Sequence, residues 1–290
     1  MIKSCLKLLR IPQWIKNLFV LVPLIFSKQL FNVSSFKDAS FGFLLFCLVS
    51  SIVYIINDII DIESDRQHHE KKHRPLATGK IKTSNAIILA ILLIAIAGIL
   101  SFKVNISFIL LLLSYLALNL IYSFSFKHIV ILDIFSIAAG FILRVIAGAV
   151  IINVEISSWL ILTTMFISLF LAIMKRRAEL NINLEDEEKV SRKVLTQYTK
   201  GFTEQIASIA ATAVLVCYAL YTVSDRTVSV FGTDNLIFTL PFVTYGIIRY
   251  MYLVFIDKKG ENTAAIIFTD AHIGINFILY IITTIYIIYI

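Results

Sequence analysis

The sequence predicts an all-α integral membrane protein with nine transmembrane helices, and two observations carry this prediction. First, 59% of the 290 residues are hydrophobic and only 16% are charged. The mean hydropathy is +0.88, which leaves too little polar surface to cover a soluble globule. Second, the apolar residues form separate runs of about 20 residues, the length that a helix needs to cross a hydrocarbon core of about 30 Å.

The expected spans are residues 14–32, 41–60, 84–102, 106–124, 129–151, 158–176, 205–224, 236–256 and 270–290. Residues 1–17 are basic and amphipathic and contain no small-residue cleavage site. We therefore expect an interfacial helix that leads into the first span rather than a removed signal peptide. No linker or charged domain interrupts the pattern, so residues 1–290 are expected to form a single membrane domain.

The distribution of Lys and Arg predicts the orientation in the membrane. They concentrate in alternate connections, above all in residues 61–83 and 177–204, whereas the other connections hold only Lys28, Lys37, Lys103 and Arg226. By the positive-inside rule, the N-terminus lies in the cytoplasm and the C-terminus outside. We expect an inner-membrane protein whose helix bundle opens a cavity toward the cytoplasm. The net charge of +7 thus reflects topology, and nucleic acid is not implied.

The segment NDIIDIESD, residues 57–65, places carboxylates at the end of the second span. At about 100° per residue, Asn57, Asp58, Asp61 and Asp65 share one face of a helix, and Glu63 points nearly the opposite way. Like charges so close together repel one another unless a hard cation such as Mg²⁺ and its phosphate ligands bridge them. The alternative is a solvated helix cap at the membrane boundary.

The acidic face continues into the basic loop RQHHEKKHRPLATG, residues 66–79. This pairing suits a metal-bound diphosphate, because Arg66 or Arg74 can neutralise phosphate oxygens while the carboxylates hold the cation. Two alternatives remain open for this loop. It could hold zinc through three histidines, or it could be a hydrated positive-inside loop. The three histidines are His68, His69 and His73.

A second charged cluster, KRRAEL, closes the sixth span at residues 175–180. Lys175 and Glu179 are one helical turn apart, so Glu179 can orient Lys175 while Lys175 and Arg176 attract an anion. The alternative is a snorkelling positive-inside signal, which we favour for Arg177 on the far side of the helix.

The fifth span carries Asp133 and Arg144 on one stripe with Gly140 and Gly148. Ionised groups at this depth require partners, and small residues let a neighbouring helix approach closely. A structural Asp133–Arg144 ion pair and a substrate contact both remain open. In the turn YSFSFK, residues 122–127, Tyr122 fits an aromatic girdle, whereas Lys127 can reach a phosphate at the cavity mouth.

These motifs together resemble the UbiA superfamily of intramembrane prenyltransferases. The resemblance rests on NDIIDIESD followed by HRPLATG and then YSFSFKH, and it runs through essentially the whole chain. It implies nine helices with an N-x-x-x-D-x-x-x-D metal site at the end of the second. Most members have another Asp-rich motif after the sixth helix, where this chain has KRRAEL. That departure argues against a prenyl diphosphate donor paired with an aromatic acceptor.

The sequence is more similar to the decaprenyl-phosphate phosphoribosyltransferase branch. The shared segments are YSFSFKH at 122–128, LRVIAGA at 143–149, MKRRAEL at 174–180 and LTQYTKGF at 195–202. This resemblance implies 5-phosphoribosyl 1-diphosphate as donor, polyprenyl phosphate as acceptor and a membrane lipid environment. UbiA-type prenyl transfer is the alternative activity. A transporter would need charges along a path through the membrane, whereas here they crowd one half. Whether the chain forms a homo-oligomer stays open.

The residues and the resemblance together give the expected site. The expected cofactor is Mg²⁺, with Asn57, Asp61 and Asp65 as ligands. The expected catalytic residues are Asp58, Asp61, Asp65 and Lys175. The expected substrate-binding residues are Asn57, Arg66, Arg74, Tyr122, Lys127, Arg144, Arg176, Glu179 and Tyr198.

Overall fold

The structure is a computed structural model that describes residues 2–67, 71–185, 193–258 and 266–290, and every regular element in these ranges is helical. The α-helices are α1 (Ile2–Leu8), α2 (Val22–Phe26), α3 (Val33–Ile60), α4 (Ile62–Gln67), α5 (Thr83–Ser101), α6 (Ile106–Phe124), α7 (Leu132–Ile151), α8 (Ser158–Glu185), α9 (Lys200–Val223), α10 (Asp225–Phe231), α11 (Leu240–Phe255), α12 (Ile266–Thr269) and α13 (Ala271–Tyr289). Short 3₁₀ helices are η1 (Ile11–Leu21), η2 (Lys71–His73), η3 (Phe126–His128), η4 (Lys193–Gln197) and η5 (Asn235–Thr239).

Within the described ranges, eight helical segments are long and apolar enough to cross a membrane. They correspond to the second through ninth expected spans. The second is longer than expected, because Asn32 caps α3 by accepting hydrogen bonds from the backbone N–H groups of Ser34 (3.0 Å) and Ser35 (3.2 Å). The prediction of an all-α membrane protein is therefore confirmed.

The first expected span, 14–32, takes a different form. The chain is helical over Ile11–Phe26, shorter than the other spans, and most of this segment is the 3₁₀ helix η1. Pro12 and Pro23 stand at the starts of η1 and α2, where their missing N–H groups leave no bond unmade. The helix ends at Phe26 with Ser27 as its C-cap, and Lys28 then adopts a left-handed conformation with φ 61°.

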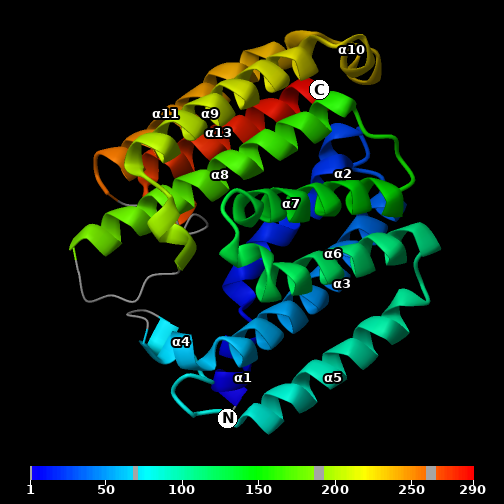
Figure 1. Ribbon diagram of the computed structural model, residues 1–290. Helices are drawn as coiled ribbons and strands as arrows, with labels where there is room; N and C mark the ends of the chain where they lie inside the picture. The colour runs from blue at the N-terminus through cyan, green and yellow to red at the C-terminus, as the bar shows by residue number, and fades with distance from the viewer. Residues whose placement is uncertain (1, 68–70, 186–192, 259–265) are drawn as a thin grey trace.

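The bundle has two groups of helices that meet at α7 (Figure 1). One group comprises η1, α3, α5 and α6, whose core includes Phe46 and Phe108. The other comprises α8, α9, α11 and α13. Helix α7 contributes Ile134 to one core and Ala147 to the other, so it fixes the two groups against each other.

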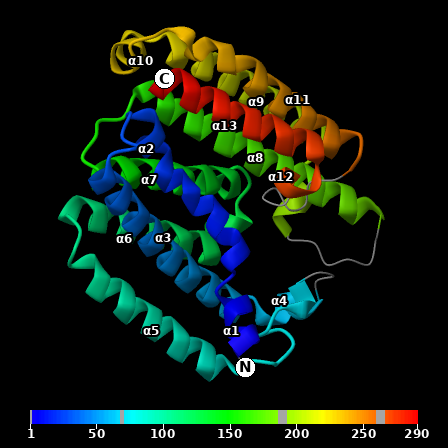
Figure 2. The same ribbon diagram turned by 180° about the vertical axis from the view of Figure 1, so that it is seen from behind.

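The chain termini lie at opposite ends of the bundle (Figures 1 and 2). Arg10 bonds to Asp58 near the carboxyl end of α3. Near the C-terminus, the hydroxyl of Tyr289 accepts a hydrogen bond from the N–H of Leu30 (3.0 Å), just before the other end of α3. This arrangement agrees with an odd number of membrane crossings.

Helix η1 packs between α3 and α7 because Gly148 leaves room for it. A Cβ atom at Gly148 would lie 2.0 Å from the backbone oxygen of Val20, well inside contact distance. The expectation that small residues on the fifth span admit a close neighbour is therefore confirmed for this position.

We expect Gly148→Ala to destabilise the protein by about 1–3 kcal/mol, because overpacking forces two backbones apart. Thermal unfolding in detergent measures the effect. Gly98→Ala on α5 is the control, since nothing lies within 4 Å of a Cβ added there. Equal melting temperatures for the two variants would contradict the close packing of η1 on α7.

Candidate functional site

The acidic segment lies where α3 ends and α4 begins. Asp61 terminates α3 with φ −94° and ψ 11°, and its N–H still donates to the carbonyl of Asn57 (2.9 Å). The N–H of Asp65 then donates to the carbonyl of Asp61 (2.8 Å). The turn keeps the side chains one helical turn apart on the same side, although the helix itself is interrupted.

The structure separates the buried carboxylates from the exposed one. Asp58 and Asp65 are buried. The side chain of Glu63 is 82% exposed and pairs with Arg66 at 2.8 Å. Arg66 is itself half exposed and also donates to the carbonyl of Ala77 (3.3 Å). Of the two expected arginines, Arg66 therefore points away from the acidic face.

Three cations meet the carboxylates on this face. Arg74 donates to Asp65 at 2.5 Å and to Asp58 at 3.2 Å. The ammonium of Lys127, buried in η3, lies 2.7 Å from Asp61. Arg10 bonds to Asp58 as well. Burial, together with the positive charge of Arg10, lowers the pKa of Arg74, and its two carboxylate partners oppose that shift. The residues just before η1 and just after η2, together with η3, therefore bring three cations to one cluster of alternating charge.

The donor set of this cluster fits a hard divalent cation. The side-chain oxygen of Asn57 is buried and makes no hydrogen bond in the structure, which is an unfavourable state for a polar atom. Asp61 and Asp65 follow Asn57 at intervals of one helical turn, and carboxylate oxygens are ligands that Mg²⁺ prefers. In the described part of the chain, no three His, Cys, Asp or Glu side chains converge as a metal site, because the carboxylates are paired with cations instead.

The zinc alternative would use three histidines. His68 and His69 lie outside the described residues, while His73 ends the short helix η2.

A second polar cluster surrounds Arg176, which is only 1% exposed. Its guanidinium donates to Asp133 (2.6 Å), to Glu179 (2.6 Å) and to the hydroxyl of Tyr122 (3.4 Å). The hydroxyl of Tyr198 donates to the other oxygen of Asp133 (2.7 Å). These contacts tie α6, α7 and α8 to the segment after η4.

Tyr198 is held by protein on both sides of its hydroxyl. It donates to Asp133 and accepts from the N–H of Ile131 (2.9 Å). Burial and the hydrogen bond to Asp133 raise the pKa of Tyr198, so it stays a protonated donor. The hydroxyl of this expected substrate-binding residue is therefore already bonded to protein groups as both donor and acceptor.

The two neighbouring cations on α8, Lys175 and Arg177, differ from Arg176 in their contacts. Lys175 is 37% exposed and lies 4.0 Å from Glu179, at the limit of an ion pair. Glu179 is held more closely by Arg176 than by Lys175. The interpretation of Arg177 as a snorkelling cation is wrong: it is buried and pairs with Glu204 of α9 at 2.7 Å, because α9 packs along this side of α8.

The Asp133–Arg144 ion pair is not formed, since Asp133 pairs with Arg176. Arg144 is buried and donates to neutral acceptors: the side-chain oxygen of Asn17 (2.8 Å), the carbonyl of Gly140 (2.8 Å) and the hydroxyl of Tyr115 (2.7 Å). Its guanidinium also lies 4.5 Å from the centre of the Tyr115 ring.

Two residues of this region, Arg10 and Lys16, were not expected at the site. Arg10 has φ 51° and ψ 46°, and it reaches Asp58 from the start of η1. Lys16 lies close enough to Arg10 and Arg144 for their charges to interact. A signal was present in the sequence, because Lys16 falls inside an expected span, just as Arg144 does.

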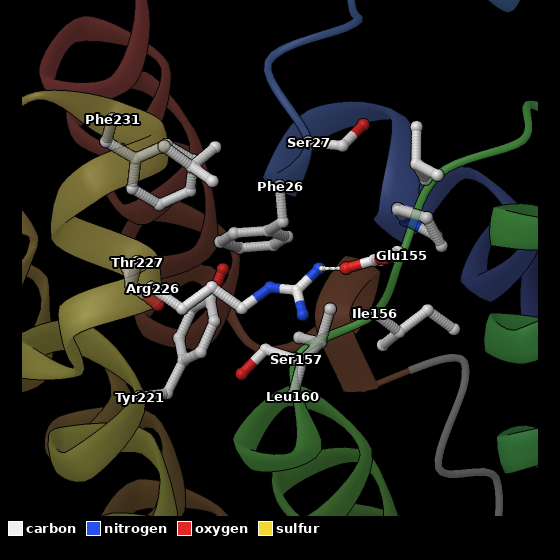
Figure 3. A pocket seen from close by; sticks show the side chains of 13 residues that line it. Phe26, Ser27, Glu155, Ile156, Ser157, Leu160, Tyr221, Arg226, Thr227 and Phe231 are labelled. Carbon is white, nitrogen blue, oxygen red and sulfur yellow. Dashed lines mark hydrogen bonds and ion pairs between the residues drawn. The ribbon is translucent and has the colours of Figure 1, made fainter.

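A separate pocket of about 310 Å³ is lined by residues of α2, α8, α9, α10 and the connection between α7 and α8 (Figure 3). The Arg226 guanidinium projects into it and pairs with Glu155 at 2.9 Å. Phe26, Tyr221 and Phe231 line its wall. None of the residues expected at the site lines this pocket.

Known proteins resemble this chain in sequence and in fold. The sequence profile described as the UbiA prenyltransferase family matches residues 20–276. Decaprenyl-phosphate phosphoribosyltransferase of Corynebacterium glutamicum is 38% identical over 74% of this chain and 66% of that protein. The protein of the same name from Mycolicibacterium smegmatis is 34% identical over 86% of this chain and 81% of its own length. That of Mycobacterium tuberculosis H37Rv is 32% identical over 90% and 86%.

Solved structures share the fold at lower identity. A UbiA homolog from Archaeoglobus fulgidus bound to GPP and Mg²⁺ superposes with a TM-score of 0.73 and 18% identity, over 99% of this chain and 100% of that one. The apo UbiA homolog from Aeropyrum pernix gives 0.67 and 15%, over 93% and 96%. From the profile match, the sequence relatives and the shared fold, it follows that the chain belongs to the UbiA prenyltransferase family.

Proposed function

We propose that the protein transfers phosphoribose from 5-phosphoribosyl 1-diphosphate to a polyprenyl monophosphate. The products are polyprenyl-phosphoryl-5-phosphoribose and diphosphate. One observation carries the proposal: carboxylates gather at the end of α3, whereas α8 carries two consecutive cations, Lys175 and Arg176, of which Arg176 is held by Asp133 and Glu179. One acidic motif suits one metal diphosphate, and the cations on α8 suit the 5-phosphate of the sugar. The name of the sequence relatives supports the same activity.

At the acidic end, Asn57, Asp61 and Asp65 would hold Mg²⁺ on the donor diphosphate, assisted by Asp58. The bound ion would offset the negative charge that grows on the leaving group. The unbonded side-chain oxygen of Asn57 supports this role. Arg74 and Lys127 already contact the carboxylates and can turn to the diphosphate oxygens. Arg74 fits this role better than Arg66, which pairs with exposed Glu63.

The reaction exchanges one bond at C1 of the ribose. The bond from C1 to the diphosphate oxygen breaks, and its electron pair leaves with diphosphate. A lone pair on the acceptor phosphate oxygen forms the new bond to C1. No strong general base is required, since a phosphate monoester is already anionic at neutral pH. The chain's main contribution would be to hold two phosphorylated substrates in line, and partly exposed Lys175 would hold the sugar phosphate.

We further propose that the membrane domain spans residues 1–290 and crosses the bilayer nine times. Ile11–Phe26 would be the ninth crossing, because a 3₁₀ helix rises about 2.0 Å per residue and the segment then reaches about 30 Å. The N-terminus and a cavity at the acidic cluster would face the cytoplasm, where the Lys-rich and Arg-rich connections lie.

Label transfer tests the proposed reaction. With purified protein and Mg²⁺, radiolabel from the ribose of phosphoribosyl diphosphate should pass into the lipid extract only when polyprenyl phosphate is present. Mass spectrometry of the lipid identifies the product. The competing activity, prenyl transfer from a prenyl diphosphate to an aromatic acceptor, should be absent. Product formation in that second assay, with none in the first, would overturn the proposal.

A further inference from the structure

Three cations gather inside the bundle where η1 passes between α3 and α7. They are Arg10, which precedes η1, and Lys16 within η1, both partly buried, and buried Arg144 in the middle of α7. Lys16 is near enough to both arginines for their positive charges to repel its own. Arg10 lies 4.9 Å above the ring of Tyr54 on α3, and the charge of Arg144 acts on the same ring. The four side chains therefore surround one region.

This region holds more positive than negative charge. Asp58 is the carboxylate that acts on this region, and it is shared between Arg10 and Arg74. The guanidinium of Arg144 is bonded only to neutral groups among its contacts with described residues. A buried cation without an anionic partner is unfavourable in a membrane protein. The imbalance points to an anion that arrives with a ligand.

Lys16 is the donor best placed to meet that anion. Its ammonium makes no hydrogen bond or ion pair with any residue that the structure describes. Part of the side chain remains accessible, yet the surrounding protein desolvates it. The hydroxyl of Tyr54 is a second donor without a hydrogen bond in the described ranges. Both groups are consistent with a recess that receives a polar headgroup.

The position of the cluster along the membrane-spanning helices indicates which kind of ligand can bind there. Tyr54 lies one helical turn before Asp58 along α3, on the membrane side of the acidic cluster. Arg144 is about halfway along α7, and its partner Asn17 donates to Ser50 (3.1 Å), two turns before Asp58. A sugar bearing several phosphates is too hydrophilic for this depth. A single phosphate on an apolar chain fits, because the chain stays in the lipid while the phosphate meets the cations.

We propose that Arg10, Lys16 and Arg144 form the binding site for the phosphate of the polyprenyl phosphate acceptor, with Lys16 in direct contact. This inference rests on the proposed function, since it assigns the second substrate of that reaction. It leaves the carboxylate cluster with Arg74 and Lys127 to the donor diphosphate. The acceptor oxygen then approaches the ribose from the membrane side, opposite the leaving group.

The test is Lys16→Met, with binding measured apart from turnover. In detergent with chelator and without phosphoribosyl diphosphate, the dissociation constant for polyprenyl phosphate should rise about tenfold to a hundredfold, as expected when a charge-assisted hydrogen bond is lost. Lys16→Arg should recover most of the affinity. Lys37→Met is the matched control: Lys37 is exposed near the other end of α3, so the same change of charge should leave binding unaltered.

Kinetics and alternative lipids complete the test. In Lys16→Met, the KM for polyprenyl phosphate should rise at least tenfold, and the KM for phosphoribosyl diphosphate should change less than twofold. Uncharged polyprenol should bind the wild type and the variant equally. A rise in the donor KM alone would assign Lys16 to the other substrate. Equal competition by phosphatidic acid would show a general phospholipid site. Either result overturns the inference.

The outcomes separate the two proposals. If polyprenyl phosphate binds in a Lys16-dependent way but no label is transferred, the reaction is wrong and the binding site stands. If label is transferred and Lys16→Met binds polyprenyl phosphate as tightly as the wild type, the reaction stands and the site is wrong. Melting temperatures close to that of the wild type establish that the variants are folded.

Discussion

Asp61→Asn is expected to reduce phosphoribosyl transfer by about a thousandfold or more. Asp61 stands between Asn57 and Asp65 on the acidic face, and its carboxylate contacts Lys127 at 2.7 Å. The amide keeps the shape and an oxygen acceptor for Lys127, but it removes the negative charge that attracts a divalent cation. Loss of several kcal/mol of transition-state stabilisation corresponds to this factor in rate. Initial rates over a range of Mg²⁺ concentrations measure the effect.

Glu63→Gln is the matched control for Asp61→Asn. Glu63 lies two residues away, but its side chain is 82% exposed and pairs only with Arg66 among the described residues. The same loss of charge should leave the rate within about twofold, since exposed ion pairs contribute little. If Asp61→Asn kept most of its activity at saturating Mg²⁺, or if both variants lost activity equally, the acidic cluster would not be the metal site.

Helical periodicity was sufficient to predict which carboxylates lie together. The positions of Asp58, Asp61 and Asp65 repeat at three and four residues, so one face was expected even though α3 ends at Ile60. The same argument placed Glu63 on the opposite side, and the structure shows it exposed. Periodicity is a local property, and it succeeds here because the segment is short.

Pairing between distant segments could not be predicted in this way. Asp133 and Arg144 share a stripe of α7, yet Asp133 pairs with Arg176 of α8 and Arg144 with Asn17 of η1. Sequence spacing gives the direction of each side chain but not which neighbour faces it. Arg10 also escaped prediction, because its reach to Asp58 depends on a left-handed backbone conformation that the sequence does not specify for an arginine.

The sequence pattern also could not predict that most of the first span is a 3₁₀ helix. An apolar run predicts a helix of sufficient length, but it does not distinguish an α-helix from the longer rise of a 3₁₀ helix. Gly148 marked the place of a close approach without identifying η1 as the neighbour. The fold class and the positions of the second through ninth expected spans were therefore predictable, whereas the contacts that shape the site depend on packing.

The largest loss of stability is expected for Arg176→Met, about 3–5 kcal/mol. Arg176 and Asp133 are 1% and 0% exposed, so the variant leaves Asp133 charged and unneutralised among apolar helices. Equilibrium unfolding in detergent measures the difference. Arg226→Met is the matched control. Its ion pair with Glu155 joins side chains that are 45% and 86% exposed, and its loss should cost less than about 1 kcal/mol.

A double variant separates structure from chemistry at Arg176. Asp133→Asn removes the stranded charge and keeps an acceptor for the hydroxyl of Tyr198, so Arg176→Met with Asp133→Asn should regain much of the lost stability. If stability returns and label transfer does not, Arg176 acts on a substrate phosphate as well as on the fold. If both return, its role is structural, and the anion at this end must be met by Lys175. If stability does not return, the buried ion pair is not the cause of the loss.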